Sequence, residues 1–274
     1  MKAFAMNGAG NAFIVIDARD RRGGLDLSRQ QVANLHAHHP FDQIMGLEDH
    51  NVADAHLRVW NADGGEVGAC GNGTRAAAWL IFEDTSQSRL TLASKGGVLG
   101  ARRLEGGTVE VDLGQPRLRW QEIPLARPMD TVQLDYSVAL PGGAVLEGPG
   151  AVSMGNPHAV FFVDDVTALP LAEIGPKIEH DPLFPERVNA GFAQTIDRQT
   201  IRLKVWERGA GLTLACGTGA CAALVAANRR GLTGREAAII ADGGELSARW
   251  DADGHVHLSG PVEMEGALDL TGIL

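Results

Sequence analysis

Cysteine is scarce in this chain. Only three of its 274 residues are cysteines, Cys70, Cys216 and Cys221. An odd, small number without a Cys-x-x-Cys pair argues against a disulfide framework and a structural zinc site. Thiols outside disulfides are typical of a reducing compartment, so we expect a cytoplasmic protein.

Several other features are missing as well. No run of about 18 apolar residues occurs, so we expect no membrane-spanning helix. The first eight residues lack the apolar stretch of a signal peptide. The formal net charge is -10 and no basic block occurs, which argues against nucleic acid or an anionic membrane as a partner. These absences leave a globular protein as the expected class. The chain is long enough for one large domain or two ordinary ones.

The most informative feature that is present is an internal repeat. The stretch from Ala69 to Ala78, which contains Cys-Gly-Asn-Gly, returns from Ala215 to Leu224 as Cys-Gly-Thr-Gly. At the same offset, further pairs of residues match: Val59-Trp60 with Val205-Trp206, Gly65 with Gly211, Gly97 with Gly243 and Gly114 with Gly260. We therefore predict two homologous halves with one equivalent cysteine each, residues 1–115 joined by the C-terminal tail 262–274, and residues 116–261.

Each repeated cysteine stands at the start of a predicted helix. A Gly-x-Gly turn follows Cys70 and Cys216, and an Ala-rich run comes directly after each turn. A helix N-terminus offers unbonded N–H groups and the positive end of the helix dipole. These groups lower the pKa of a thiol and bind a carboxylate. Two such helix ends would supply two reactive thiols and donors for one anion.

The rest of each half reads as short strands. Segments such as Ala55 to Trp60 and Ile201 to Trp206 alternate apolar and polar residues, which favours antiparallel or mixed sheets over a doubly wound parallel sheet. We therefore predict an α/β (α+β) fold with two pseudo-symmetric halves, each a sheet or barrel wrapped around one central helix. A further helical segment is predicted from Leu169 to His180, with a break near Gly175-Pro176.

Two thiols in equivalent places suit a reaction at a carbon acid. One thiolate removes the α-proton from one face, and the other thiol delivers a proton to the opposite face. Racemases with a single base usually need a cofactor as an electron sink, whereas a two-base enzyme does not. The N–H donors at the two helix ends would stabilise the charge that develops on the carboxylate, and they belong to Gly71, Asn72, Gly217 and Thr218.

Beyond the cysteine turns, the chain carries other motifs in a definite order: Gly10-Asn11, Phe41-Asp42-Gln43, Asn61-Ala62-Asp63-Gly64, Met154-Gly155-Asn156-Pro157-His158, Phe184-Pro185-Glu186-Arg187-Val188-Asn189 and Glu207-Arg208-Gly209. Together these motifs resemble the diaminopimelate epimerase family, almost from end to end. The cysteine turns alone mark only the wider superfamily of cofactor-independent racemases.

The resemblance implies interconversion of LL- and meso-diaminopimelate, in lysine and peptidoglycan precursor synthesis, without metal or pyridoxal phosphate. It implies that Cys70 and Cys216 are the acid and base, and that His158 and Glu207 modulate their protonation. It also implies a homodimer of two pseudo-symmetric halves. The substrate contacts that it implies are Asn11, Gln43, Asn61, Gly71, Asn72, Asn156, Asn189, Glu207, Arg208, Gly217 and Thr218.

Two positions depart from the family pattern. The family usually has Gly-Asn-Asp-Phe near its start, whereas Ala12 stands here in place of the aspartate. The family also usually has an aromatic residue shortly after a Gly-Pro near the C-terminus, at the dimer contact. Here no aromatic residue follows Gly260-Pro261 as far as Ala267.

Other cysteine and histidine residues have simpler interpretations. Cys221, on the predicted Ala-rich helix, is expected to pack in the hydrophobic core. His36, His38 and His39 are expected to form a solvated helix end, because no cysteine or carboxylate pattern completes a metal site.

Alternative functions remain open at this stage. One is a racemase of the same fold that acts on another amino acid, such as histidine or proline. From a different class, the chain could be a thiol redox protein or an amino-acid-binding module. In either the epimerase or the redox protein, a bridge between Cys70 and Cys216 would be an inactive, oxidised form.

Overall fold

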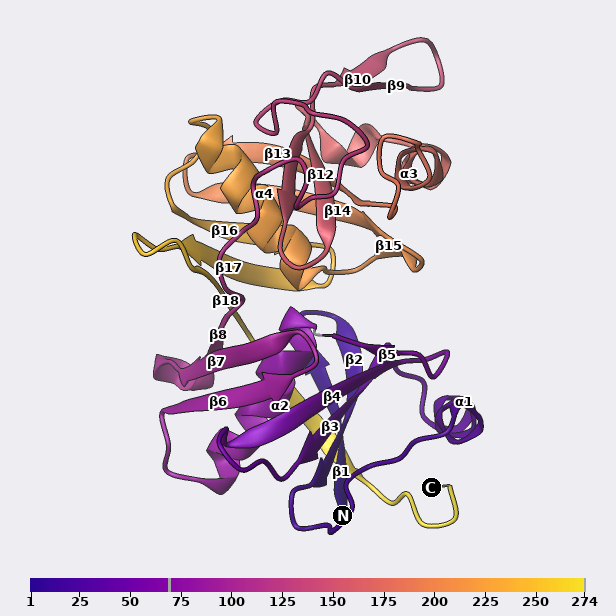
Figure 1. Cartoon of the computed structure of the whole chain (residues 1–274), viewed down its shortest axis with the longest axis vertical. Helices are drawn as coiled ribbons and strands as arrows, with labels where there is room; N and C mark the ends of the chain where they lie inside the picture. The colour runs from indigo at the N-terminus through magenta and orange to yellow at the C-terminus, as the bar shows by residue number, and fades with distance from the viewer. Residues whose placement is uncertain (69, 274) are drawn as a thin grey trace. The chain divides into compact units, whose positions relative to one another are not determined.

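The computed structural model describes residues 1–68 and 70–273, so Ala69 of the repeat lies outside the described residues. It divides the chain into two compact units (Figure 1). Unit 1 contains Met1–Asp112 and Ser259–Leu274, and unit 2 contains Leu113–Leu258. The boundaries expected from the sequence, after residues 115 and 261, lie a few residues further along the chain.

Unit 1 is built from one sheet and two α-helices. Its elements in chain order are β1 (Lys2–Gly8), β2 (Asn11–Ala18), α1 (Arg29–His38), β3 (Gln43–Glu48), β4 (Ala55–Asn61), β5 (Glu66–Val67), α2 (Gly71–Asp84), β6 (Arg89–Ser94), β7 (Gly97–Arg103), β8 (Val109–Asp112) and β19 (Glu263–Leu268). The last strand returns from the C-terminal end of the chain and pairs with β1 in antiparallel fashion.

Unit 2 contains a sheet, two α-helices and a separate hairpin. Its elements in chain order are β9 (Ser137–Ala139), β10 (Val145–Glu147), β11 (Gly150–Ser153), β12 (Pro157–Phe162), α3 (Leu171–Glu179), β13 (Asn189–Asp197), β14 (Thr200–Glu207), β15 (Gly211–Thr213), α4 (Gly217–Arg229), β16 (Glu236–Ala241), β17 (Gly244–Trp250) and β18 (Val256–Gly260), whose last two residues belong to unit 1. Strands β9 and β10 pair only with each other in the described chain.

The two units repeat one sheet topology. In unit 1, β1 and β2 are antiparallel, β2 and β3 parallel, β3 and β4 antiparallel, β4 and β6 parallel, and β6 and β7 antiparallel. In unit 2 the same sequence of pairings joins β11, β12, β13, β14, β16 and β17. The predicted α/β fold with two pseudo-symmetric halves and mixed sheets is therefore confirmed.

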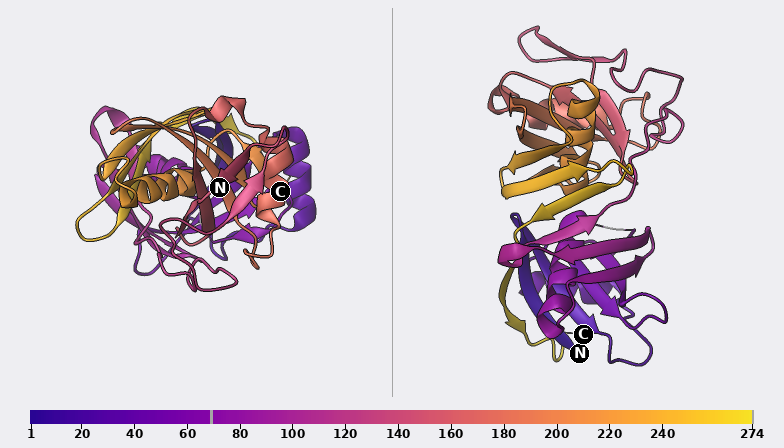
Figure 2. Two further views of the ribbon diagram at one scale, coloured as in Figure 1. Left: turned by 90° about the horizontal axis from the view of Figure 1, so that it is seen from above. Right: turned by 90° about the vertical axis from the view of Figure 1, so that its left-hand side faces the viewer.

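Each sheet packs around one Ala-rich helix. Helix α2 contacts β1, β2, β3, β7 and β8, and α4 contacts strands β11 to β14, β16 and β17; Figure 2 shows both helices among the strands of their own units. The alanines from Ala76 to Ala78 are completely buried, as are Ala220, Ala222 and Ala223. Small side chains on every face allow strands to approach these helices from several sides, which explains the Ala-rich runs.

Helix α3 differs from the expectation. The sequence predicted a break near Gly175-Pro176, but the helix runs without interruption from Leu171 to Glu179 with Pro176 inside it. Two causes account for the difference. Gly175 has no Cβ to clash with the proline ring, and Ile174 and Ile178 are both buried in the core of unit 2, so packing offsets the lost hydrogen bond.

No helix in the described parts of the chain is long and apolar enough to cross a membrane.

Candidate active site

Cys70 forms the N-cap of α2. Its backbone is extended, with φ -141° and ψ 117°, and its sulfur accepts a hydrogen bond from the N–H of Gly73 at 3.4 Å. A side chain at position 73 would overlap the thioether of Met45, so any residue larger than glycine would require Met45 to shift. The half-buried sulfur is thus held at the positive end of the helix, where a thiolate is stabilised.

Asn72 is fixed in orientation by both of its amide atoms. Its Oδ1 accepts from Nη1 of Arg75 at 2.8 Å, and its Nδ2 donates to Oδ1 of Asn11 at 2.7 Å. Arg75 has no exposed surface at all, and a buried guanidinium costs stability unless its hydrogen bonds are made. The sequence prediction missed Arg75, although a lone charged residue before an Ala-rich run was a usable signal.

Asp42 supports the start of β2, where Ala12 stands in place of the aspartate that the family usually has. Its Oδ2 accepts from the backbone N–H of Ala12 at 2.9 Å and from Nδ2 of Asn11 at 3.3 Å. A carboxylate directly before β3 therefore supports the first residues of β2, although residue 12 has no carboxylate of its own. The sequence prediction quoted Asp42 within a motif but assigned it no role.

Gln43 and Asn61 form a second polar pair in unit 1. They lie opposite each other in the antiparallel register of β3 and β4, and Nε2 of Gln43 donates to Oδ1 of Asn61 at 2.8 Å. Because both side chains leave the same face of the sheet, this pairing follows directly from the strand register.

Cys216 is the N-cap of α4 and is more deeply buried than Cys70. Only 6% of its surface is exposed. Burial and the neighbouring Glu207 carboxylate raise the pKa of the Cys216 thiol well above its ordinary value, while Thr218 and the N–H of Gly219 oppose them. Cys216 is therefore a thiol at neutral pH.

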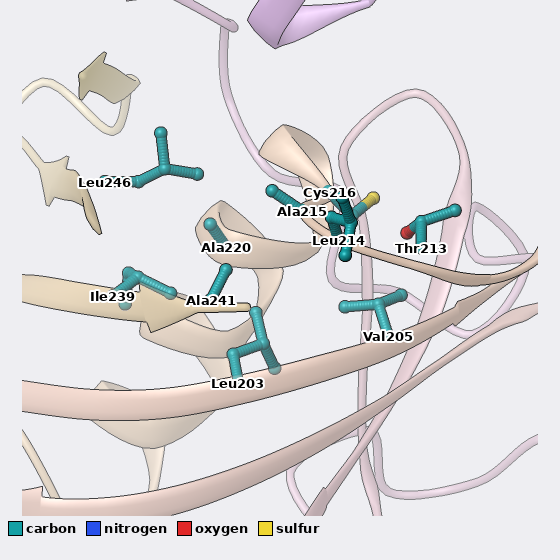
Figure 3. A pocket seen from close by; sticks show the side chains of 10 residues that line it. All are labelled: Leu203, Val205, Thr213, Leu214, Ala215, Cys216, Ala220, Ile239, Ala241 and Leu246. Carbon is teal, nitrogen blue, oxygen red and sulfur yellow. The ribbon is translucent and has the colours of Figure 1, made fainter. Parts of the chain in front are cut away.

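An apolar cavity lies beside Cys216 (Figure 3). Besides the cysteine and Thr213, its lining is formed by hydrophobic residues, namely Leu203, Val205, Leu214, Ala215, Ala220, Ile239, Ala241 and Leu246. In Figure 3 the sulfur points toward the side of Thr213 and away from Ile239 and Leu246. Burial is the largest of the causes that raise the thiol pKa.

Thr218 connects Cys216 to a buried histidine. Its Oγ1 lies 3.6 Å from Sγ of Cys216, 3.1 Å from Nε2 of His158 and 3.2 Å from Nδ2 of Asn156. His158 Nε2 also lies 3.1 Å from Oδ1 of Asn156. Complete burial, assisted by the charge of Arg208, lowers the pKa of His158 to about 3, so the imidazole is neutral. The threonine hydroxyl thus contacts both the sulfur and the imidazole.

Glu207 is the last residue of β14, and Arg208 begins the turn that follows. The carboxylate of Glu207 accepts from the hydroxyl of Thr213 at 2.6 Å, a contact that the sequence prediction did not include. The backbone N–H of Arg208 donates to Oδ1 of Asn189 at 2.9 Å, and its Nη1 donates to the carbonyl of Glu186 at 2.8 Å. The guanidinium itself lies on an exposed residue.

Asn189 is tied to the protein through both ends of its amide. Besides accepting from Arg208, it donates through Nδ2 to the carbonyl of Pro157 at 3.0 Å, and it is almost fully buried. These two bonds fix the orientation of the amide.

The predicted site residues fall into two sets, one in each unit. Unit 1 holds Asn11, Gln43, Asn61, Cys70, Gly71 and Asn72, and unit 2 holds Asn156, His158, Asn189, Glu207, Arg208, Cys216, Gly217 and Thr218. Among residues 1–68 and 70–273, no three histidine, cysteine or acidic side chains gather in a way that could hold a metal ion. His36, His38 and His39 therefore form no such group.

The sequence of the chain matches the family described as Diaminopimelate epimerase over residues 3–119 and 150–265. The chain is 51% identical to the diaminopimelate epimerase of Phenylobacterium zucineum over 266 residues, with 96% of each protein covered. It is 52% identical to the diaminopimelate epimerase of Acidiphilium cryptum over 270 residues, which cover 96% of this chain and 95% of the relative.

A solved structure is similar in fold. The hydroxyproline epimerase of Agrobacterium vitis, determined with bound trans-4-hydroxy-L-proline, superimposes with a TM-score of 0.66 over 98% of this chain and 90% of its own. Its sequence is 15% identical, so this likeness concerns the architecture only.

Proposed function

Because the chain belongs to the diaminopimelate epimerase family, we propose that it interconverts LL- and meso-diaminopimelate by a two-base reaction without a cofactor. The observation that carries this proposal is the pair of cysteines, Cys70 and Cys216, each of which caps the central helix of one unit. Their equivalent positions give each unit one thiol at a helix N-terminus, as a two-base reaction requires.

In the proposed reaction one cysteine is a thiolate and the other a thiol. The thiolate takes the α-proton, so that the C–H bond breaks and its electron pair moves toward the substrate carboxylate. The second thiol then gives its proton to the opposite face of the α-carbon and becomes the thiolate. Charge and atoms balance, and the resting state is restored by the reverse turnover or by proton exchange with water.

We propose that backbone N–H groups stabilise the carbanionic intermediate. Gly71 and Asn72 begin α2, and Gly217 and Thr218 begin α4. N–H groups in the first turn of a helix have no acceptor within the helix, so they are available for the reacting carboxylate. Fixed donors of this kind favour the charge that develops in the transition state.

The distal end of the substrate carries a carboxylate and an ammonium group. We propose that Arg208 binds the carboxylate and Glu207 the ammonium, with Asn11, Gln43, Asn61, Asn156 and Asn189 completing the hydrogen bonds. Opposite charges on adjacent residues match the amino-acid group at that end. A racemase for a small apolar amino acid would have no use for this pair.

The family relationship also supports a homodimer that acts in the cytoplasm. A reducing compartment keeps both proposed catalytic cysteines as thiols, which the reaction requires. Light scattering coupled to size-exclusion chromatography tests the dimer: a mass near 58 kDa would support it, because one chain has a mass of 29.0 kDa.

Proton NMR in D₂O tests the activity directly. With meso-diaminopimelate, reductant and a metal chelator present, we expect the α-proton signal to disappear and the LL isomer to form. Cys70→Ala and Cys216→Ala should each lower the rate by at least ~10³-fold. Cys221→Ala is the matched control, because that buried cysteine lies on α4 away from its first turn.

Two results would overturn the proposal. One is the absence of exchange in wild-type protein whose thiols titrate as reduced. The other is undiminished exchange in either the Cys70 or the Cys216 variant.

A further inference from the structure

A buried carboxylate outside the predicted site lies behind the Glu207-Arg208 turn. Glu179 is the last residue of α3, and only 4% of its side chain is exposed. The C-terminal end of a helix is the negative end of its dipole, so a carboxylate there is unfavourable. Burial increases that cost, and the charge is tolerated only if donors surround it.

Two of these donors belong to the segment Trp206–Gly209, which comprises the end of β14 and the start of the turn after it. Oε2 of Glu179 accepts from Nε1 of Trp206 at 2.8 Å, and Oε1 accepts from the backbone N–H of Gly209 at 2.9 Å. Glu207 and Arg208 stand between these two donors in the sequence. Nη1 of Arg187 adds a third, longer contact at 3.3 Å. Burial by itself would raise the pKa of Glu179, but the bonds from Trp206 and Gly209, together with His180 and Arg187, lower it below its ordinary value, so the group is an anion at neutral pH.

The helix that carries Glu179 is shaped to receive Trp206. Gly175 lies one turn before Glu179, and a Cβ at this position would overlap the indole ring. Helix α3 and the tryptophan are therefore in direct contact through a position that admits no side chain. The distance between Glu179 and the turn is set by this packing as well as by the hydrogen bonds.

We infer that Glu179 is a positioning residue that holds the Trp206–Gly209 turn, and thereby keeps Glu207 beside Cys216 and the guanidinium of Arg208 ready for the substrate's distal carboxylate. The part that concerns Arg208 rests on the proposed function. The part that concerns Glu207 and Cys216 needs no substrate, because Glu207 acts on the thiol in the protein alone.

The two bonds make glutamine an informative substitution. Each oxygen of Glu179 accepts a hydrogen bond from a different N–H group. A glutamine in either orientation therefore places its NH₂ group opposite one of these donors, and that hydrogen bond is lost. In Glu179→Gln, the loss of one bond loosens the turn without a change in side-chain volume. Removal of the opposing donor, in Glu179→Gln combined with Trp206→Phe, lets the amide oxygen accept from Gly209 again.

The experiment compares four variants in the α-proton exchange assay. For Glu179→Gln we expect KM to rise about 10-fold and kcat to change less than about threefold, because the distal end is bound equally in the ground and transition states. In the double variant, the logarithm of KM should return at least half of the way from the Glu179→Gln value to the wild-type value. Trp206→Phe alone should raise KM in the same direction by a smaller factor. Glu110→Gln, which removes another largely buried carboxylate bonded to an arginine, should leave KM unchanged.

A second readout separates this inference from the proposed function. Alkylation of Cys216, followed by peptide mass spectrometry without substrate, should be at least about threefold faster at fixed pH in Glu179→Gln, because a displaced Glu207 no longer raises the pKa of the thiol. Glu110→Gln should react like the wild type. If the wild-type protein exchanges no α-proton, the proposed function fails and the alkylation rate alone decides the inference.

The inference is overturned by an unchanged alkylation rate in Glu179→Gln, by a wild-type KM in an active enzyme, or by equal KM values in the single and double variants. If Glu179→Gln does not fold, Trp206→Phe replaces it, because that variant removes one of the same two bonds. An unchanged KM and alkylation rate in Trp206→Phe would then overturn the inference.

Discussion

The hydroxyl oxygen of Thr218 lies 3.6 Å from the sulfur of Cys216, within hydrogen-bond distance for a thiol, and it stabilises the thiolate form. The same oxygen contacts His158 and Asn156, so the proton state of the cysteine is linked to a network that begins 60 residues away in the chain. Glu207 acts in the opposite direction and stabilises the thiol. This balance leads to the first two predictions.

Thr218→Val should raise the pKa of Cys216 further, because the variant removes a donor to the thiolate. A hydrogen bond to a charged group contributes about 1.5–3 kcal/mol, which corresponds to a roughly 10- to 100-fold lower alkylation rate at fixed pH. Iodoacetamide labelling with peptide mass spectrometry measures the rate for Cys216 separately. Thr233→Val is the control, because that buried hydroxyl has no hydrogen-bond partner in the described chain. An equal loss in both variants would contradict the proposed link.

Glu207→Gln should lower the pKa of Cys216, since it removes the like charge that disfavours the thiolate. Alkylation of Cys216 should therefore become faster at neutral pH. Epimerisation should nevertheless fall by about 10²-fold, because the proposed contact with the substrate ammonium is lost. Glu173→Gln, on the exposed face of α3, should change neither rate. A slower alkylation in Glu207→Gln would mean that the carboxylate does not act on the thiol as described.

His158 should make the folded state sensitive to acid. Its pKa is about 3 in the folded protein, below the ordinary value of 6.5, so between these values the unfolded chain binds a proton that the folded chain does not. The contribution of His158 to the free energy of unfolding should thus be fully present above about pH 6.5. As the pH drops toward 3, the free energy of unfolding should decrease by roughly 1 kcal/mol per pH unit. Urea unfolding at several pH values measures this slope.

His158→Gln should show a flatter pH dependence than the wild type, because glutamine does not titrate. His38→Gln, on the exposed end of α1, should keep the wild-type slope. Identical slopes for the wild type and His158→Gln would show that the imidazole is not held neutral in the folded state.

Asp42→Ala should weaken substrate binding, because it removes the acceptor that holds the Ala12 N–H and the Asn11 amide. We expect KM to rise by about 3- to 10-fold with a smaller change in kcat. Stability should change by less than about 1 kcal/mol, since these bonds are exposed. Asp42→Asn, which keeps one oxygen, should have a smaller effect, and Asp20→Ala should have none. A wild-type KM in Asp42→Ala would exclude this role.

Local features of the sequence determined much of this protein. The Cys-Gly-x-Gly turns and the Ala-rich runs after them predicted α2, α4 and their capping cysteines, because turn geometry, helix propensity and capping act within a few neighbouring residues. Strand alternation and the repeat likewise predicted two halves with mixed sheets. The pairing of Gln43 with Asn61 depended on the register between two strands, although both residues came from recognised motifs.

Only the tertiary structure decided which residues that are far apart in the sequence come into contact. The sequence had no local signal for Glu179, whose donors come from a turn about 30 residues later, or for the carboxylate of Asp42 beside Ala12. It also predicted a break in α3 that core packing around Ile174 and Ile178 prevents. The pKa of Cys216 follows the same rule, since burial and Glu207 oppose the helix end that lowers a thiol pKa. Burial and long-range hydrogen bonds exist only once the chain has folded, whereas turns and helix caps are encoded by adjacent residues.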